Sequence, residues 1–275
     1  MLRSTPVKIG MTVFKHKLIQ NIHLSTATSG VQMVMLVRSG KEYFTDFIER
    51  EAKSQKLRLV VNGSFIDLSA TASFKVKVFG GPLTANESLT LGRVIQDGRL
   101  LDGTEEEGKF YFSQNDYGAE KFSAGSGVAP ASSCSAIGGL APIIVDGLAY
   151  GAQNLYKLGV PDDAPLTGDV SSTHAPHLVQ KSNAMFKDIL ARGLTVGKTA
   201  IGYNNLKKSL LVVSQAHGVE GISAERVQQL FTGHGADSAV FLDCSDSATL
   251  YFDGEFKVSP GKDKNEFLKV AVGFK

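Results

Sequence analysis

Residues 239–250 read AVFLDCSDSATL and change abruptly from apolar to small polar side chains. The run from Ala239 to Leu242 predicts a buried strand, because it is short, continuous and apolar. This strand delivers Asp243 to a turn of small residues, in which Asp246 follows three positions later. Two carboxylates with hydroxyl neighbours are typical of a general acid/base site or a cation site. A turn with solvated side chains explains the same pattern, so both interpretations stay open.

Two other segments place polar side chains where a strand ends or begins. Residues 60–65, VVNGSF, end an apolar run at Asn62, and a carboxamide suits sugar hydroxyls because it both donates and accepts hydrogen bonds. Residues 197–202, GKTAIG, begin a strand with Lys198, whose ammonium can hold a phosphate oxygen. The structural alternatives are a simple turn and an exposed lysine at a strand end.

The common metal, nucleotide and nucleophile motifs give no lead. The sequence lacks the GxGxxG, GxxxxGK[ST] and GxSxG patterns. His174 and His177 have the look of a metal-binding pair but flank a proline that disfavours a helix, so we expect a surface or loop role, with metal binding as the alternative. Cys134 and Cys244 match no zinc spacing and are expected to be free thiols, with a disulfide as the alternative. Cys244 and His217 could together form a catalytic nucleophile. The alternative is that Cys244 is a buried, inert thiol.

Composition excludes some classes of protein. The 275 residues are 43% hydrophobic and 20% charged, as in ordinary globular proteins. A formal net charge of +2 argues against a dedicated nucleic-acid binder. No apolar run approaches the roughly 18 residues of a membrane span, and the N-terminus lacks the apolar core of a signal peptide. We therefore expect a cytoplasmic location, with signal-independent export or a phage particle as alternatives; the oligomeric state is not indicated.

Local patterns predict many strands and few helices. Strands are expected at residues 31–38, 56–61, 73–79, 141–147, 195–202 and 209–214. Helices are expected at 41–54, at 183–192, and after a Ser223 cap up to Gly233 or Gly235. Turns of hairpins are expected at Asp97-Gly98, Asp102-Gly103 and Asp253-Gly254.

The segment 123–140 is poor in bulky side chains, which predicts either a flexible linker or a loop that lets a ligand approach the backbone. No repeat and no clear domain boundary interrupts the chain. The excess of strands over helices predicts an α+β fold, with a mixed β-sheet and a few packed helices.

The order and spacing of these segments resemble the phosphodiester glycosidase family. The resemblance covers about residues 60–273 and is most specific over 195–254. The blocks that carry it, in the family's order, are Asn62-Gly63-Ser64-Phe65, Ala141 to Gly147, Lys198 to Gly202, Leu210 to Gly218, Gly221 to Ala224, and Leu242 to Thr249. The resemblance implies a single domain over 1–275, with an N-terminal strand–helix part at 1–59 and a family-like core at 60–273.

The resemblance also implies an activity: a hydrolase that cleaves the glycosidic bond of a sugar-1-phosphodiester, giving a free sugar and a phosphomonoester. By position, Asp243 is expected at the reacting centre, Lys198 at the phosphate and Asn62 at the sugar or phosphate. A further set is expected to bind substrate or support the turn: Ser64, Thr199, His217, Asp246, Ser247 and Thr249. The expected partner is a glycan or sugar phosphate. No metal ligands are assigned, although Asp243 and Asp246 leave a divalent cation such as Ca²⁺ open.

Five positions depart from the pattern of this family. Lys198 replaces an arginine, which keeps the charge but loses bidentate geometry. Cys244-Ser245-Asp246 replaces three glycines, and Arg226 stands where the family has a glutamate. The alternative function is therefore a binding protein on the same scaffold that has lost catalysis and recognises a glycan or sugar phosphate.

Overall fold

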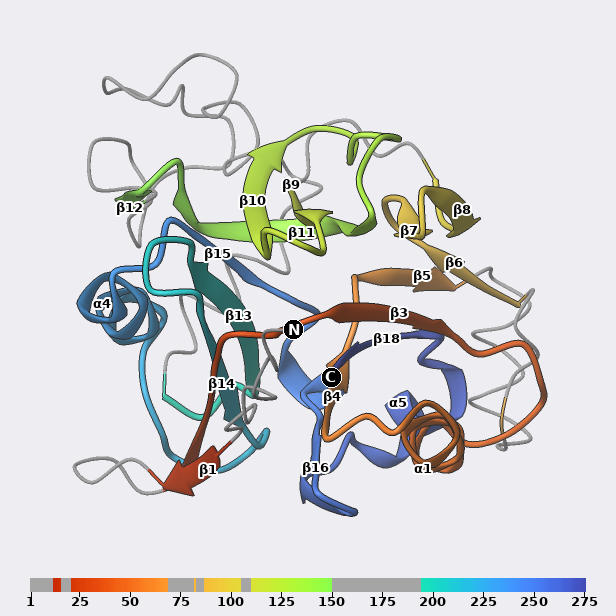
Figure 1. Ribbon diagram of the computed structural model, residues 1–275. Helices are drawn as coiled ribbons and strands as arrows, with labels where there is room; N and C mark the ends of the chain where they lie inside the picture. The colour runs from red at the N-terminus through yellow and green to blue at the C-terminus, as the bar shows by residue number, and fades with distance from the viewer. Residues whose placement is uncertain (1–11, 16–20, 69–81, 83–86, 105–109, 150–193) are drawn as a thin grey trace, which may run out of the picture.

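Two β-sheets share one apolar core, and helices cover their outer faces (Figure 1). The computed structural model describes residues 12–15, 21–68, 82, 87–104, 110–149 and 194–275. Every strand pair among these residues is antiparallel, so the expectation of a mixed sheet was wrong. The fold is mostly sheet with some helices, not a balanced α+β fold. Hairpins and returning connections reverse the chain direction, whereas parallel strands need long crossovers.

The larger sheet has eleven strands within the described residues. Its main path runs β1-β2-β14-β13-β15-β11-β7-β8, while β9 pairs with β10 and β11, and β12 pairs with β11. The strands are β1 (Thr12–Lys15), β2 (Ile22–Thr28), β7 (Val94–Gln96), β8 (Arg99–Asp102), β9 (Phe110–Asp116), β10 (Lys121–Ser126), β11 (Ser135–Val145), β12 (Leu148–Ala149), β13 (Lys198–Asn204), β14 (Ser209–Gln215) and β15 (Ser238–Phe241).

The smaller sheet has the order β17-β16-β4-β18-β3. Its strands are β3 (Met33–Val37), β4 (Leu59–Asn62), β16 (Leu250–Phe252), β17 (Glu255–Val258) and β18 (Val270–Phe274). A separate pair is formed by β5 (Ile66–Leu68) and β6 (Ser88–Thr90). Because β3 and β4 pair with β18, segments from opposite ends of the sequence lie side by side in one sheet.

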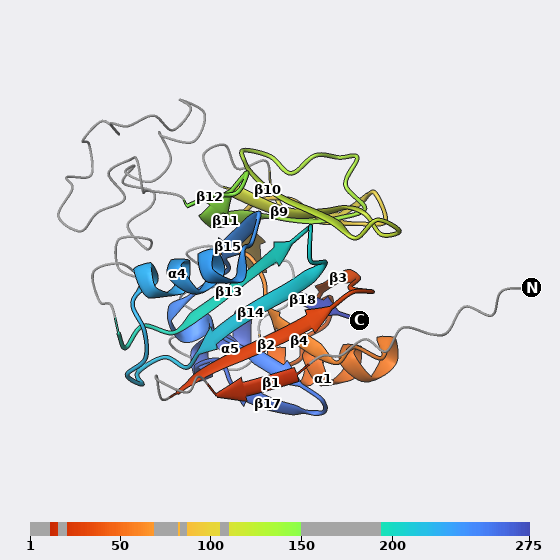
Figure 2. The ribbon, with the colours of Figure 1, turned by 60° about the vertical axis from the view of Figure 1, so that its left-hand side comes forward.

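The helices lie outside the two sheets. Figure 2 shows α4 (Ala224–His234) across β13 and β14, while Figure 1 shows α1 (Phe44–Gln55) and α5 (Lys262–Phe267) together beside the smaller sheet. Ser223 caps α4 by accepting a hydrogen bond from Arg226 N at 3.2 Å, and Gly235 ends the helix with φ 74°, as predicted. The buried face of α1 contains the predicted stripe Phe44, Phe47, Ile48 and Ala52.

Most other local predictions that fall on described residues are confirmed with shifted ends. The predicted strands at 31–38, 56–61, 141–147, 195–202 and 209–214 correspond to β3, β4, β11, β13 and β14. The turns Asp97-Gly98 and Asp253-Gly254 join β7 to β8 and β16 to β17. The strand expected at 73–79, the helix expected at 183–192, and His174 with His177 lie outside the described residues.

The small-residue segment 123–140 is strand at both ends, so the flexible-linker interpretation was wrong; residues 127–134 between the strands form a loop, whose expected approach to a ligand stays a prediction. The segment supplies the end of β10 and the start of β11, and every residue of β11 is buried. Small side chains are needed here because neighbouring chains approach closely. A Cβ on Gly125, for example, would lie 2.5 Å from the Tyr111 hydroxyl.

Polar side chains of the larger sheet cover the free edge of β3. Gln114 accepts a hydrogen bond from Met33 N at 2.8 Å and donates to Val31 O at 2.8 Å. Gln96 accepts from Met35 N at 2.7 Å. These side chains replace the missing neighbour of an edge strand, and they join the two sheets by directional bonds as well as by apolar burial.

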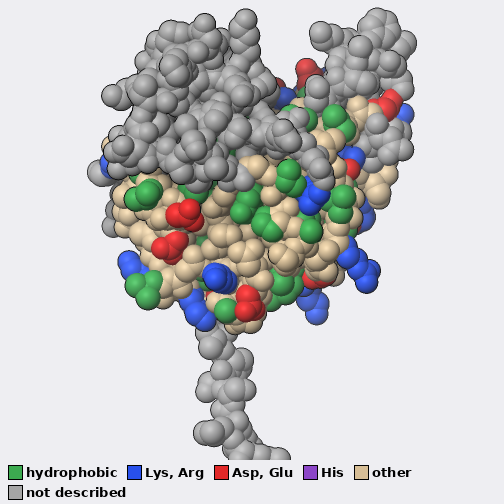
Figure 3. Space-filling model, turned by 90° about the horizontal axis from the view of Figure 1, so that it is seen from above, with side chains coloured by type: hydrophobic (Ala, Val, Ile, Leu, Met, Phe, Trp, Pro, Cys, Tyr) green, Lys and Arg blue, Asp and Glu red, His purple; other side chains and the backbone are tan. Residues whose placement is uncertain are grey.

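The surface charge is mixed on the face that Figure 3 shows. On the described part of this face, acidic, basic and hydrophobic side chains are interspersed. Among the described residues, no helix has the length and apolar character needed to span a membrane.

We expect two glycine substitutions near α4 to have opposite effects on stability. A Cβ on Gly202 would lie 2.5 Å from the Phe231 ring, so Gly202→Ala is expected to lower the free energy of unfolding by about 1–3 kcal/mol. Gly233 lies within α4 with open space around it, so Gly233→Ala is expected to raise it by up to about 1 kcal/mol. Urea unfolding of both variants measures the difference, and equal effects would contradict the packing described here.

Candidate active site

The chain crosses from the larger to the smaller sheet through residues 242–249. The segment leaves β15, forms the short helix η4 (Ser245–Ser247), and enters β16. Three backbone hydrogen bonds hold its first half: Leu242 N to Thr199 O (2.9 Å), Asp243 N to Gly63 O (2.9 Å), and Ser245 N to Gly197 O (2.8 Å). The structure therefore brings together the three segments that the sequence singled out: the end of β4, the start of β13 and the crossing turn.

The Asn62 carboxamide holds both ends of this crossing turn. Its Nδ2 donates to Asp243 O at 2.6 Å, and its Oδ1 accepts from Thr249 N at 3.0 Å. Asn62 is fully buried. Both polar ends of the side chain are thus bonded to backbone groups, which places Asn62 in the support of the turn. Thr249 adds a bond within the turn, from its hydroxyl to Ser247 O at 2.9 Å.

Asp243 carries a buried carboxyl that the surrounding protein does not fully satisfy. The residue is 1% exposed, and its Oδ1 has no hydrogen-bond partner within the described part of the chain. The pKa of Asp243 is raised to about 6, mainly by burial, and the negative charge of Asp246 acts in the same direction. Lys264, Ser247 and the Cys244 backbone amide act in the opposite direction. A carboxyl with this pKa exchanges a proton near neutral pH.

Buried hydroxyls without partners come from the same three segments. Ser64 Oγ, Thr199 Oγ1 and Ser247 Oγ form no hydrogen bond of normal geometry among the described residues, although the Ser247 side chain lies near enough to lower the Asp243 pKa. Ser214 Oγ, opposite Thr199 in the β13–β14 register, is equally unpartnered. Buried polar atoms usually have partners, so this concentration of unsatisfied oxygens marks a site with capacity for a ligand or water.

Lys198 is fully buried, and its ammonium donates to Val196 O at 2.8 Å. The structure thus places the predicted phosphate-binding cation inside the protein, next to the backbone that precedes β13. Its charge lowers the pKa of the neighbouring Cys244, although burial raises that pKa to about 12.

The hypothesis of a nucleophile formed by Cys244 and His217 is not supported. The Cys244 thiol donates to Leu242 O at 3.2 Å, and its raised pKa keeps it protonated at neutral pH. The exposed His217 places Nδ1 3.3 Å from Gly197 N and 3.4 Å from Ser245 Oγ. No bond joins Cys244 to His217 among the residues that the structure describes.

The accessible rim of the site is formed by His217, Ser245, Asp246 and Lys264. Asp246 is 42% exposed in its side chain and Lys264 21%, and 3.8 Å separates Asp246 Oδ1 from Lys264 Nζ. The backbone of Asp246 is held by Gly261 N, which donates to Asp246 O at 2.7 Å. Polar, partly exposed groups thus lie over the buried Asp243.

The turn keeps a glycine-type conformation at one of the positions where glycine is absent. Ser245 has φ 61°, in the left-handed region. Gly197 allows this turn to approach β13, because a Cβ there would lie 2.1 Å from Ser245 O. Ser245 thus adopts a backbone conformation that favours glycine, at some cost in backbone strain.

Metal binding has little support in the described residues. They contain no group of three or more His, Cys, Asp or Glu side chains placed to hold a metal ion. Asp246 pairs with Lys264, and Asp243 is the only carboxylate of the turn that is buried.

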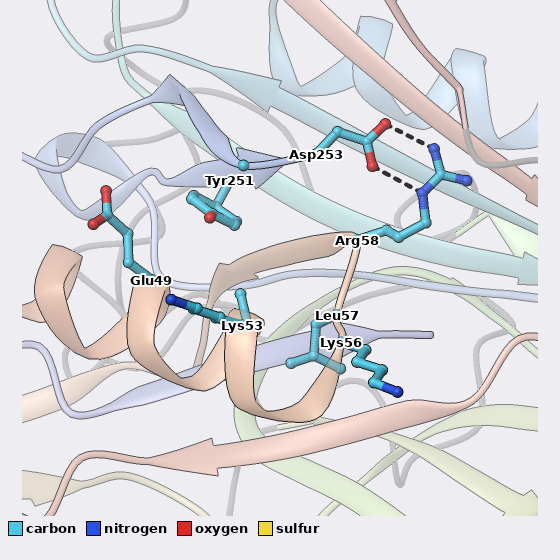
Figure 4. A pocket seen from close by; sticks show the side chains of 9 residues that line it. Glu49, Lys53, Lys56, Leu57, Arg58, Tyr251 and Asp253 are labelled. Carbon is cyan, nitrogen blue, oxygen red and sulfur yellow. Dashed lines mark hydrogen bonds and ion pairs between the residues drawn. The ribbon is translucent and has the colours of Figure 1, made fainter.

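An open hollow of about 610 Å³ lies elsewhere, between α1 and the β16–β17 hairpin (Figure 4). Arg58 and Asp253 form a two-point ion pair on its wall, with distances of 2.8 and 2.7 Å. Arg58 precedes β4 whereas Asn62 ends it, so the hollow is about 13 Å along the strand from the crossing turn. It contains none of the predicted site residues.

Sequence patterns did not identify two residues of the site, Gly197 and Lys264. Gly197 has no local signal of its role, which depends on a close approach to a turn 48 positions later. Lys264 has no local signal, because only the packing of α5 beside η4 brings it near Asp246.

Removing the Asn62 carboxamide is expected to be costly. Asn62→Ala leaves two buried backbone groups, Asp243 O and Thr249 N, without partners, which lowers the free energy of unfolding by about 2–4 kcal/mol. Asn115→Ala, whose side chain is exposed and bonds only to other side chains, serves as the control. Equal urea midpoints for the two variants would contradict the role of Asn62 in holding both ends of the crossing turn.

Asp243 is expected to give the fold an unusual dependence on pH. Its folded pKa of about 6 exceeds its ordinary 3.8, so the folded state binds more protons in this window and loses stability as the pH rises through it. Above about pH 6 the cost approaches about 3 kcal/mol. Asp243→Asn removes this cost, so its stability relative to wild type should rise between about pH 4 and pH 7.5.

Urea unfolding at the two pH values measures this effect. The exposed Asp263, in the first turn of α5, provides the control variant Asp263→Asn. If the Asp243→Asn and Asp263→Asn differences change alike with pH, the buried carboxyl is not the source of the dependence.

Comparison with known proteins agrees with this architecture. The catalytic domain of zebrafish N-acetylglucosamine-1-phosphodiester alpha-N-acetylglucosaminidase, auto-inhibited by its pro-peptide, superimposes with a TM-score of 0.57 at 14% identity, over 99% of this chain and 84% of that one. A putative exported protein of Burkholderia pseudomallei gives a TM-score of 0.52 at 13% identity, over 92% and 73%. These likenesses show a shared fold. No curated protein matches in sequence.

The family assignment comes from the sequence. The model of the phosphodiester glycosidase family matches residues 55–274, which is most of the chain and includes β4, β13 and the crossing turn. The resemblance seen in the motifs is thereby confirmed. The chain belongs to the phosphodiester glycosidase family.

Proposed function

We propose that the chain hydrolyses the glycosidic bond of a sugar-1-phosphodiester, with Asp243 as the catalytic carboxyl. The observation that carries the proposal is the state of Asp243: 1% exposed, unpartnered at Oδ1 among the described residues, and with a pKa raised to about 6. It also lies in the block Leu242 to Thr249, one of those that carry the resemblance to the family. Groups with such perturbed pKa values are concentrated at functional sites.

For hydrolysis of a sugar-1-phosphodiester, an ionised carboxylate is more important than a strong general acid. Water adds to the anomeric carbon, the bond from that carbon to the phosphate oxygen breaks, and the products are a free sugar and a phosphomonoester. Because the phosphate already leaves readily, the main tasks are to stabilise the developing oxocarbenium ion and to accept a proton from water. Ionised Asp243 is suited to both.

Neighbouring groups supply recognition and support. The unpartnered hydroxyls of Ser64, Thr199 and Ser247 are suited to sugar or phosphate oxygens, since a hydroxyl both donates and accepts. Asn62 and Thr249 hold the turn from which Asp243 projects. The zebrafish enzyme of the same fold is named for an N-acetylglucosamine-1-phosphodiester, and we propose this sugar as the first substrate to test.

A binding protein without turnover is the second candidate. The observation that favours it is the burial of Lys198 and Asp243, at 0% and 1% exposure, which separates both groups from a ligand at the rim. Such a protein would be stabilised thermally by a sugar phosphate but would release no product.

Sugar release from an N-acetylglucosamine-1-phosphodiester is the decisive measurement, with a nitrophenyl N-acetylglucosaminide as the uncharged comparison. We expect release from the diester, and Asp243→Asn is expected to lower kcat about 10²–10⁴-fold because it removes the carboxylate. Asp263→Asn is expected to retain wild-type kcat. The kcat of the wild type should rise with pH through about 6, as Asp243 ionises.

Two results would contradict the proposal. Undiminished kcat in Asp243→Asn would remove Asp243 from the catalytic step. Absence of release by folded wild-type protein, together with thermal stabilisation by N-acetylglucosamine 1-phosphate, would favour the binding protein.

A further inference from the structure

We propose that Lys264, and not Lys198, supplies the positive charge that receives the substrate's phosphate. This inference rests on the proposed function and names the group that recognises the anionic part of the substrate. It assigns a binding role to α5, a helix that carries none of the family-like blocks singled out in the sequence.

Accessibility separates the two lysines. Lys198 is fully buried, and its Nζ donates to Val196 O at 2.8 Å. The Lys264 side chain is 21% exposed and lies on the rim with Asp246. A phosphate that arrives from solvent therefore meets Lys264 before any group of β13.

The position of Lys264 is defined by its surroundings. Gly261 N donates to Asp246 O at 2.7 Å, which fastens the start of α5 to η4. Lys264 Nζ lies 5.0 Å from the centre of the Phe267 ring, a distance typical of a cation–π contact that steadies the ammonium. The ammonium is thus held over the turn that contains Asp243.

The charge of Lys264 is only partly used within the protein. Its distance of 3.8 Å to Asp246 Oδ1 is longer than a hydrogen bond, and partly exposed pairs of this kind contribute little to stability. Asp246 by itself would repel a phosphate. Lys264 offsets that repulsion, and its charge also reaches Asp243, whose pKa it lowers. One ammonium can therefore attract the phosphate and favour the ionised form of the catalytic carboxyl.

Calorimetric titration with N-acetylglucosamine 1-phosphate tests the inference, because binding is read without turnover. Lys264→Gln is expected to weaken binding about tenfold or more, through loss of a charge-assisted hydrogen bond. Lys262→Gln, at an exposed position of the same helix, is the matched control and should change the affinity less than twofold. Free N-acetylglucosamine, which has no phosphate, should bind Lys264→Gln and wild type alike.

Two further variants keep the test independent of folding. Lys264→Arg retains the charge and should restore most of the affinity. Asp246→Asn removes the competing carboxylate and should tighten binding about two- to fivefold. Three results would each overturn the inference. They are equal affinities of Lys264→Gln and Lys262→Gln for the sugar phosphate, weaker binding of it by Asp246→Asn than by wild type, and no binding of it by wild type.

Kinetics separate this inference from the proposed function. If the wild type hydrolyses the diester while Lys264→Gln leaves its KM unchanged, the inference fails and the proposed function stands. If no variant releases sugar but phosphate binding depends on Lys264, the proposed function fails and Lys264 remains an anion-binding residue.

Discussion

One buried carboxamide connects the parts of this protein on which the candidate site depends. The chain leaves the larger sheet at Phe241 and enters the smaller one at Leu250, and Asn62 bonds to the backbone at both ends of that crossing. Because Asn62 also ends β4, the same side chain fixes the crossing turn against the middle of the smaller sheet. Through these two hydrogen bonds, one residue ties the crossing turn, and with it Asp243, to the smaller sheet.

Burial of this crossing explains the unusual state of Asp243. A turn between two packed sheets is shielded from water, so a carboxylate there loses hydration that few neighbouring groups replace. Lys264 and the Cys244 amide offset part of this loss, but Oδ1 is left without a partner among the described residues. The resulting pKa near neutrality is destabilising for the fold and useful for proton exchange, a combination expected where structure serves chemistry.

The shape of the crossing turn and the placement of its charges have different physical origins. Ser245 keeps the left-handed conformation that glycine favours, and Gly197 still permits the close approach of the turn. The charges near the turn differ in exposure: Lys198 is enclosed, while Asp246 and Lys264 lie on the rim. Backbone hydrogen bonds and packing define the shape, so side-chain replacements are tolerated there. Recognition of an anion depends on where individual charges lie and how exposed they are, which is why we propose this role for Lys264 and not for the buried Lys198.

The sequence by itself determined the local elements and the blocks of the site. The periodicity of α1, the Ser223 cap, the Gly235 end and the turns at Asp97-Gly98 and Asp253-Gly254 depend on residues close in the chain. The small residues of 123–140 led to the wrong prediction of a flexible linker, because the same side chains occur in loops and in tightly packed strands. Only the tertiary structure decided the antiparallel pairing, the burial of Lys198, and the meeting of Asp243 with Asn62 and Lys264. These features join residues that are far apart in the sequence. The interactions among them depend on the exclusion of water, which no local sequence pattern encodes.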